Sequence, residues 1–342
     1  MLRPGWNSTV AGKWSACLTL SAMLASAAWG QACLTGEDLK APVRAKLEAA
    51  AAKYFDLAAK GDVAGLKDHA IPSVSADFSG IAAAVRENQP SFAKAEGVTR
   101  STFELIAEGD APLERAEFLC GVFGKSGQTS TSAEFVLNSL PPGQYGIVIL
   151  DVSNKAAPDD GPYSAAFVLQ QADGDWKLGG FQVKAVRSAG HDSAWFAQQA
   201  RVFAAKSEMH NAWYYFLEAR NLATVVPFMS TRVTDRLYDE AQKIAPADAL
   251  DGVPKDLTWA GKNYKVKNAF AYGVAGQINL VVKFESQDVS DAARSVAETQ
   301  AVVRALVTKW PELRDGFAAI EARATEASGR DFGTLVMLKD LK

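Results

Sequence analysis

The sequence is poor in the residues that most often carry chemistry. Its 342 residues include three cysteines and three histidines, and no two of the histidines stand at the spacing of metal ligands. A zinc site or another resident cofactor is therefore not expected. The G-x-S-x-G turn of many serine hydrolases is also missing. The sequence assigns no catalytic residue, and whether the protein is an enzyme stays open.

Positive charge is not in excess either. The chain carries 36 lysines and arginines against 39 acidic residues, for a net charge of -3. A nucleic-acid partner is not expected, because binding to phosphates requires an excess of basic side chains. Beyond the N-terminal segment, no apolar run approaches the length of a membrane-spanning helix, so the mature chain is expected to have no stable span.

What the sequence has in quantity is apolar side chains and length. Hydrophobic residues make up 48% of the chain, which is enough to build buried cores. A chain of 342 residues exceeds the usual size of one core, which favours two domains. We predict a signal peptide (1–30), a first α+β domain (31–187), a helical segment (188–247) and a second, smaller α+β part (248–342).

The N-terminus has the pattern of an export signal. Arg3 and Lys13 supply positive charge, an apolar stretch covers residues 14–29, and the small residues Ala28 and Gly30 are spaced as a signal peptidase requires. We therefore expect cleavage after residue 30 and a mature protein that is periplasmic or secreted. An uncleaved membrane anchor is the alternative.

Two cysteines remain once the signal is removed, because Cys17 lies inside it. An even number of cysteines in an exported chain favours pairing, so we predict a disulfide between Cys33 and Cys120. Such a cross-link stabilises a fold by about 4 kcal/mol in the chain-entropy account. The alternative is a lipid anchor on Cys33. Ala32 suits a lipoprotein signal, but the two residues before it do not.

The first domain begins with helical patterns. Residues 39–60 are rich in Ala, Lys, Glu and Leu, with apolar side chains at helical spacing. Gly61 then supplies a stop signal, and Asp62 can cap a short second helix. A further helix is expected over residues 78–85, and it should end before Pro90.

The same domain then changes to a strand pattern. Five runs of β-branched and aromatic residues begin at Ser101, Arg115, Ser130, Tyr145 and Tyr163, with turn signals between them. The last of these runs continues into a hairpin over residues 167–183, whose turn is Asp173-Gly174. Helices followed by adjacent strands predict an α+β fold with an antiparallel sheet.

Two stretches, YFDLAAKGDVAGL at residues 54–66 and DGDWKLGGF at residues 173–181, resemble the NTF2-like superfamily. The resemblance implies a cone-shaped antiparallel sheet wrapped around helices. The superfamily includes isomerases, dehydratases and non-catalytic binding modules, so fold membership alone does not decide the chemistry. Aromatic side chains would line a ligand site in the cone, or simply fill its core: Tyr54, Phe55, Phe78, Phe103, Phe118, Tyr145 and Trp176.

Residues 188–247 return to the helical period. Two helices are expected over residues 193–207 and 210–225, like one tetratricopeptide-type hairpin, and a third over residues 235–245. Asp192 can cap the first of them. The second carries four consecutive aromatic residues, 213–216, which must cover most of its circumference. Either this helix is sandwiched between two domains, or it binds a partner. The candidate partner-binding residues are Trp213, Tyr214 and Tyr215.

The remaining chain is predicted to form a ββαββ unit. Residues 248–261 have the composition of a loop. Two alternating strands follow, then a strongly amphipathic helix over residues 291–310, and then two closing strands. This order predicts a second small α+β layer structure.

These features favour a binding protein over an enzyme. The leading hypothesis is an exported, non-catalytic module that binds a small apolar ligand in the cone, or a protein partner. One alternative is an isomerase or hydro-lyase with a buried acid in the cone, for which Asp56, Asp77 and Asp151 are candidates, although each is better explained as a surface charge. The other alternative is a structural or assembly protein that binds partners through the aromatic helix.

Overall fold

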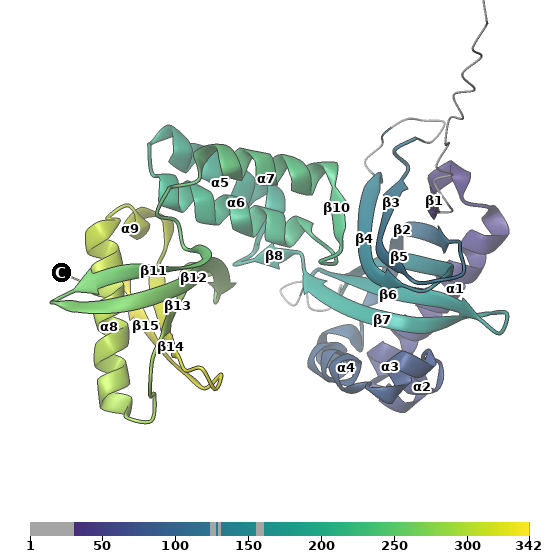
Figure 1. Ribbon diagram of the computed structural model, residues 1–342, viewed down its shortest axis with the longest axis horizontal. Coiled ribbons are helices and arrows are strands. Elements are labelled where there is room, and N and C mark those ends of the chain that lie inside the picture. Colours follow the sequence, from purple (N-terminus) through teal and green to yellow (C-terminus); the bar gives the residue numbers. More distant parts are fainter. Residues whose placement is uncertain (1–30, 124–127, 129–130, 155–160, 342) are drawn as a thin grey trace, which may run out of the picture.

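A computed structural model of the chain describes residues 31–123, 128, 131–154 and 161–341 (Figure 1). The predicted signal peptide, with Cys17, lies outside the described residues. The fold mixes helices with mostly antiparallel sheets, as the sequence predicts. We call residues 31–185 the N-terminal part and residues 187–341 the C-terminal part. In Figure 1 the two parts lie side by side, and three helices of the C-terminal part extend over the space between them.

The N-terminal part is built on a five-stranded antiparallel sheet, the first sheet. The turn of its last hairpin has φ values of 54° at Asp173 and 84° at Gly174, as a two-residue hairpin turn requires. The predicted runs from Ser101, Tyr145 and Tyr163 form strands of this sheet, whereas those from Arg115 and Ser130 form strands of a second sheet. Strand β1 is an addition that the sequence pattern did not indicate. In spatial order the strands are β1 (Gln31–Thr35), β2 (Glu96–Ala107), β5 (Gly143–Ser153), β6 (Tyr163–Ala172) and β7 (Asp175–Ala185).

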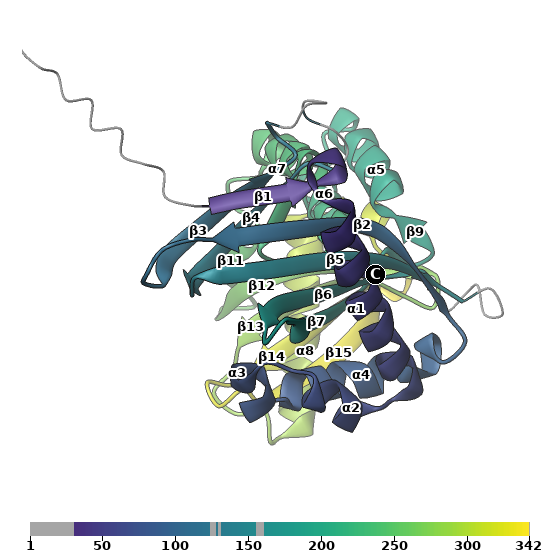
Figure 2. The same cartoon turned by 90° about the vertical axis from the view of Figure 1, so that its right-hand side faces the viewer.

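Four helices cover one face of the first sheet, and Figure 2 shows the longest of them lying across the strands. Gly61 ends that helix in the left-handed region, with a φ of 71°. Asp62 caps the next helix by accepting a hydrogen bond of 2.8 Å from the Gly65 backbone amide. Both signals were predicted. The helices are α1 (Ala41–Lys60), α2 (Val63–Asp68), α3 (Pro72–Ala76) and α4 (Ser79–Phe92).

The prediction that α4 ends before Pro90 is wrong, because the helix continues to Phe92. Two residues of α4 follow the proline, so its missing amide removes a hydrogen bond only in the last turn, where the loss is small. The Phe92 side chain is buried and contacts Phe55 and Tyr163, with ring centroids 5.4 and 6.0 Å away. This tertiary packing keeps the last turn helical.

A second, three-stranded sheet covers part of the opposite face of the first sheet. Its strands, in spatial order, are β10 (Met229–Thr231), β4 (Ala133–Leu140) and β3 (Leu113–Cys120). The predicted disulfide is confirmed: Cys33 on β1 is bonded to Cys120 on β3. It uses the thiol that a lipid anchor on Cys33 would require. Strand β10 belongs to the C-terminal part in sequence, so it connects the two parts.

The helical segment contains α5 (Ser193–Ala205), α6 (Met209–Ala223) and α7 (Arg232–Ile244), close to the predicted ranges. It is preceded by a short hairpin of β8 (Arg187–Ser188) and β9 (His191–Asp192). Asp192 caps α5 as expected, because its carboxylate accepts a hydrogen bond of 2.9 Å from the Trp195 amide.

The C-terminal sheet has five strands, one more than predicted. The expected loop over residues 248–261 is wrong, because it contains an edge strand. That strand has one deeply buried side chain, Leu257, and its register shifts between Asp251 and Lys255, around Pro254. A bulged edge strand with a proline lacks the alternating pattern that identifies a strand. In spatial order the strands are β11 (Asp251–Trp259), β12 (Lys262–Val274), β13 (Gln277–Glu285), β14 (Ala319–Thr325) and β15 (Asp331–Met337).

The predicted amphipathic helix, α8 (Ala292–Lys309), connects β13 to β14, and the short α9 (Leu313–Gly316) follows it. Strands β13 and β14 run parallel, as a helical crossover requires, whereas the other pairs in this sheet are antiparallel. Among the described residues, no helix is both long and apolar enough to cross a bilayer.

Candidate ligand-binding cavity

The aromatic residues predicted to line a cone do not surround one space. Tyr54, Phe55, Phe78 and Trp176 belong to the core between the first sheet and its helices, whereas Phe103, Phe118 and Tyr145 belong to the core between the two sheets. The first sheet separates the two groups. Tyr54 and Trp176 also line an open cavity of about 410 Å³ beside His69. A ligand-binding role for the seven residues stays a prediction.

Aromatic packing fills both cores of the N-terminal part. On the helical side, the rings of Phe167 and Phe181 stack with centroids 5.0 Å apart. Between the sheets, Phe103 and Phe135 meet edge to face, also at 5.0 Å. Interiors packed in this way leave little room for a ligand. A site is therefore better sought outside these cores.

The aromatic helix α6 is buried on all sides. Its four consecutive aromatic residues, Trp213 to Phe216, are each at most 5% exposed. Tyr215 contacts Phe203 on α5 at 4.9 Å and Phe317 after α9 at 5.7 Å, both between ring centroids. The helix is thus sandwiched, but it lies between its neighbouring helices and the C-terminal sheet and not between two domains. Partner binding through Trp213, Tyr214 and Tyr215 stays a prediction that would require this core to open.

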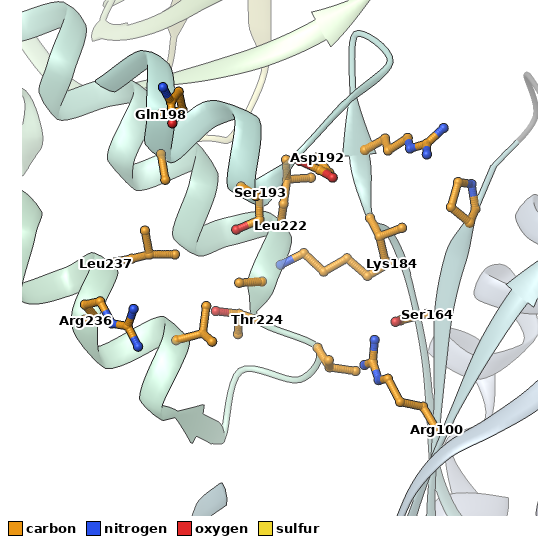
Figure 3. A pocket seen from close by; sticks show the side chains of 18 of the residues that line it. Arg100, Ser164, Lys184, Asp192, Ser193, Gln198, Leu222, Thr224, Arg236 and Leu237 are labelled. Carbon is orange, nitrogen blue, oxygen red and sulfur yellow. The ribbon is translucent and has the colours of Figure 1, made fainter. Parts of the chain in front are cut away.

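A cavity of about 680 Å³ lies between the first sheet and the three helices α5, α6 and α7 (Figure 3). Its sheet wall carries Arg100, Ser164 and Lys184. The helical wall is largely apolar, and it includes Ala197, Leu222, Val225, Val233 and Leu237. Pockets of about 300 to 1,000 Å³ with apolar walls and a few polar groups are typical of small-molecule sites. We call it the junction cavity.

Strand pairing places the polar groups of the sheet wall in one row. Asp151 on β5 lies opposite Ser164 on β6, which lies opposite Lys184 on β7. Residues opposite one another in paired strands share a face of the sheet. These three side chains therefore project from the face turned toward α5, α6 and α7, and not from the face that α1 to α4 cover. Arg100 sits at a register shift in β2 between Thr99 and Ser101, and its guanidinium contacts the Asp151 carboxylate at 3.0 Å.

Lys184 extends across the junction cavity toward the end of α6 (Figure 3). Its ammonium donates to the Asn221 carbonyl oxygen and, at 2.9 Å, to the Asn221 side-chain oxygen. A cation at a helix C-terminus is stabilised by the helix dipole. Burial lowers the pKa of Lys184, and the nearby Glu218 carboxylate partly offsets that effect. Lys184 therefore connects β7 of the N-terminal part to α6 of the C-terminal part, and its ammonium group is only partly exposed to solvent.

Ser164 is the least satisfied polar group of the cavity. The residue is 2% exposed, and its hydroxyl has no hydrogen-bond partner among the described residues. Figure 3 shows that hydroxyl directed into the cavity. A buried hydroxyl without a partner costs about 1 to 3 kcal/mol, so such groups in native proteins call for an explanation. A bound molecule in the cavity would supply the missing partner.

Basic residues predominate in the cavity lining. Arg201 is neutralised by a two-point ion pair with Glu240, at 2.7 and 2.9 Å. Asp192, the one acidic lining residue in the described chain, is occupied by capping α5. Arg187 and Arg236 form no ion pair with another described residue. The basic lining residues are Arg100, Lys184, Arg187, Arg201 and Arg236.

The acids that sequence analysis considered are all exposed, namely Asp56, Asp77 and Asp151. The structure instead buries Glu104 and Glu218, which are 5% and 6% exposed. Burial raises the pKa of each; the Lys40 charge partly offsets this for Glu104, and hydrogen bonds from Asn221 and Ser188 do so for Glu218.

The alternation of side chains along a strand was the sequence signal that could have indicated the burial of Glu104. It places Glu104 on the face opposite Phe103 and Leu105, but it cannot show that α1 covers that face. Glu104 lies opposite Gly146 in the sheet, and the position of a Cβ at Gly146 would be 2.1 Å from the Leu47 side chain of α1. Glu104 lines neither of the two cavities described above.

His210 forms a separate polar cluster at the start of α6. Its Nδ1 lies 2.8 Å from a Glu312 carboxylate oxygen, and its Nε2 lies 2.9 Å from Asp248. The ring stacks on Trp310 with centroids 4.2 Å apart. Both ring nitrogens are occupied, so neither is free for acid–base chemistry in this arrangement. The cluster connects α6 to the segments before β11 and α9.

In the part of the chain that the structure describes, no group of three histidine, cysteine or acidic side chains is arranged to hold a metal ion. Comparisons of the chain with protein-family models, with curated proteins and with solved structures find no match.

Proposed function

We propose that this protein is an exported binding module that holds a small organic ligand in the junction cavity and performs no chemistry on it. The observation that carries the proposal is the buried hydroxyl of Ser164, which has no hydrogen-bond partner within the described chain and lies at the wall of a cavity of about 680 Å³. A cavity of this size with an apolar wall and a few polar groups suits a small molecule.

The disulfide supports export, because such cross-links persist in oxidising compartments and are rare in the cytosol. A protein isolated from its native cells with both Cys33 and Cys120 as free thiols would contradict export. The resemblance to the NTF2-like superfamily is supported by the helices packed on one face of an antiparallel sheet. In this proposal the ligand binds beside that sheet rather than within its filled cores.

The proposal is tested by filling the cavity. Ala194 lines the cavity and is exposed, so Ala194→Trp inserts bulk into the site without disturbing the core. The probe is anilinonaphthalene sulfonate, whose fluorescence rises in apolar sites. We expect the wild type to bind it and Ala194→Trp to lose most of the signal. The control Ala83→Trp, at an exposed position of α4, should bind like the wild type.

Two results would contradict a ligand site in the junction cavity. Equal probe binding by the wild type and Ala194→Trp would place the probe elsewhere. Absence of binding by the wild type would equally count against a ligand site in the junction cavity.

An isomerase or hydro-lyase remains the alternative, and Glu104 is the residue that supports it. It is a buried acid in the N-terminal part, and burial raises its pKa, which is the direction that favours a protonated general acid. Isomerase activity that is lost in Glu104→Gln while the fold is retained would favour the enzyme. Unchanged activity in that variant would exclude Glu104 as the acid.

A further inference from the structure

We infer that the ligand of the junction cavity is an organic anion with an apolar body, and that its charged group lies against Ser164, Arg100 and Lys184. The inference rests on the proposed function and adds the chemical class of the ligand. It is drawn from the register of the first sheet, the hydrogen-bond capacity of these three residues, and the character of the facing wall.

Three residues of the sheet wall carry hydrogen-bond donors that are not fully used. The Lys184 ammonium has three donors, of which two are directed to Asn221. The Arg100 guanidinium has five, and one of its nitrogens contacts Asp151. The hydroxyl of Ser164, directly opposite Lys184 in the strand pairing, is unpartnered among the described residues. In Figure 3 the Ser164 hydroxyl and the Arg100 side chain lie near one another at the sheet wall, and Lys184 extends from the same wall across the cavity toward α6.

The local charge favours an anion over a cation. Asp151 lies in the same row, but its charge is balanced by Arg100. The Glu218 carboxylate stands near Lys184, but it does not line the cavity. Arg187 and Arg236 then add positive charge without an ion-pair partner among described residues. A cleft lined by one sign of charge concentrates ligands of the opposite sign.

The helical wall, which faces these residues across the cavity, determines the character of the uncharged part of the ligand. Side chains of α6, its following loop and α7 present aliphatic surface to the cavity. An uncharged body can lie against that surface, since removing apolar area from water is favourable. An inorganic ion would leave this wall uncovered. The described aliphatic lining residues here are Leu222, Ala223, Val225, Val233 and Leu237.

The test compares three probes that share one body: octanoate, octanol and octylammonium. Their affinities for the disulfide-bonded protein are measured by titration calorimetry. We expect octanoate to bind about tenfold or more tightly than octanol, because a carboxylate accepts charge-assisted hydrogen bonds that an alcohol does not. Octylammonium should bind most weakly. Added salt should weaken octanoate binding and leave octanol binding unchanged.

A matched pair of serine variants locates the charged group. Ser164→Ala removes a hydroxyl that bonds to none of the residues the structure describes, so the fold should be retained. This variant should weaken octanoate about tenfold and leave octanol unchanged. The control is Ser295→Ala in α8, whose hydroxyl is likewise buried and unpartnered among described residues but does not line the cavity. It should bind all three probes like the wild type.

The outcomes separate this inference from the proposed function. Equal affinities for the three probes, tightest binding of octylammonium, or an octanoate affinity unchanged by Ser164→Ala would each overturn the anionic ligand and leave the cavity as a binding site. Failure of all three probes to bind, together with a fluorescent probe that ignores Ala194→Trp, would reject the cavity itself.

Discussion

At the scale of single residues, Asp248 is a carboxylate that joins three side chains of the C-terminal part. It accepts hydrogen bonds from His210 at 2.9 Å, from the Trp310 indole at 3.0 Å, and from Lys309 at 2.9 Å. Burial acts to raise its pKa, but the hydrogen bonds from Lys309, His210 and Trp310 outweigh burial and hold the pKa of Asp248 well below its usual range. The residue therefore stabilises the fold in its ionised form.

Asp248→Asn should lower the free energy of unfolding at pH 7 by about 1 kcal/mol. Charge-assisted hydrogen bonds contribute more when buried, but this side chain is 42% exposed and solvent screens it. A depressed folded-state pKa contributes stability above the unfolded value, about 3.9 for aspartate, and that stability is lost as the pH falls through the folded-state pKa. The difference between wild type and variant should therefore shrink in urea unfolding below about pH 4.

The control for this prediction is Asp256→Asn, at an exposed position of the edge strand β11. It should unfold at the same urea concentration as the wild type, both at pH 7 and at pH 3. A difference for Asp248→Asn that stays constant from pH 7 down to pH 3 would mean that packing, and not the carboxylate charge, is responsible.

At the scale of elements, the disulfide holds the first strand to the fold. Strand β1 is five residues long and pairs along its length with β2 alone, while Cys33 connects it to β3. The cross-link joins residues separated by 87 positions in the chain, so it restricts a long loop in the unfolded state.

The double variant Cys33→Ala, Cys120→Ala should lower the free energy of unfolding by about 4 kcal/mol, the chain-entropy value for a loop of this order. Urea unfolding of the oxidised wild type, the reduced wild type and the double variant measures the effect. The reduced wild type should match the variant. If oxidised and reduced wild type unfold at the same urea concentration, the cross-link contributes no stability.

At the scale of the whole molecule, the two parts are held by contacts between segments far apart in the chain. Strand β10 completes the second sheet of the N-terminal part, and Lys184 reaches the end of α6. Within the C-terminal part, β12 passes so near the β8–β9 turn that a Cβ at Gly273 would lie 2.0 Å from the Ala189 backbone nitrogen. Only a residue without a side chain fits this approach.

Gly273→Ala should therefore destabilise the protein by about 1 to 3 kcal/mol, the usual cost of overpacking a tight contact. The obstacle is backbone, which cannot rotate away as a side chain could. Thermal unfolding measures the effect. Gly80→Ala is the control, since a Cβ there meets nothing within 4 Å, and in a helix this exchange should be neutral or stabilising. Equal melting temperatures for Gly273→Ala and wild type would show that β12 and the β8–β9 turn can move apart without loss of stability.

Local patterns in the sequence were sufficient for the separate elements. The turn at Asp173-Gly174, the stop at Gly61 and the caps at Asp62 and Asp192 were all predicted, because each depends on a few adjacent residues. The disulfide followed from counting cysteines. Where local rules failed, at Pro90 and in the edge strand β11, contacts with distant segments had overridden them.

Only the tertiary structure decided where a ligand could bind. The sequence indicated aromatic residues of the first domain, which pack into two separate cores. Ser164 and Lys184 gave no signal, because serine and lysine in a strand usually face water. They became a candidate site when helices from later in the chain covered that end of the sheet. A periodic pattern shows that two faces of a strand differ, but what covers each face depends on segments that the pattern does not contain.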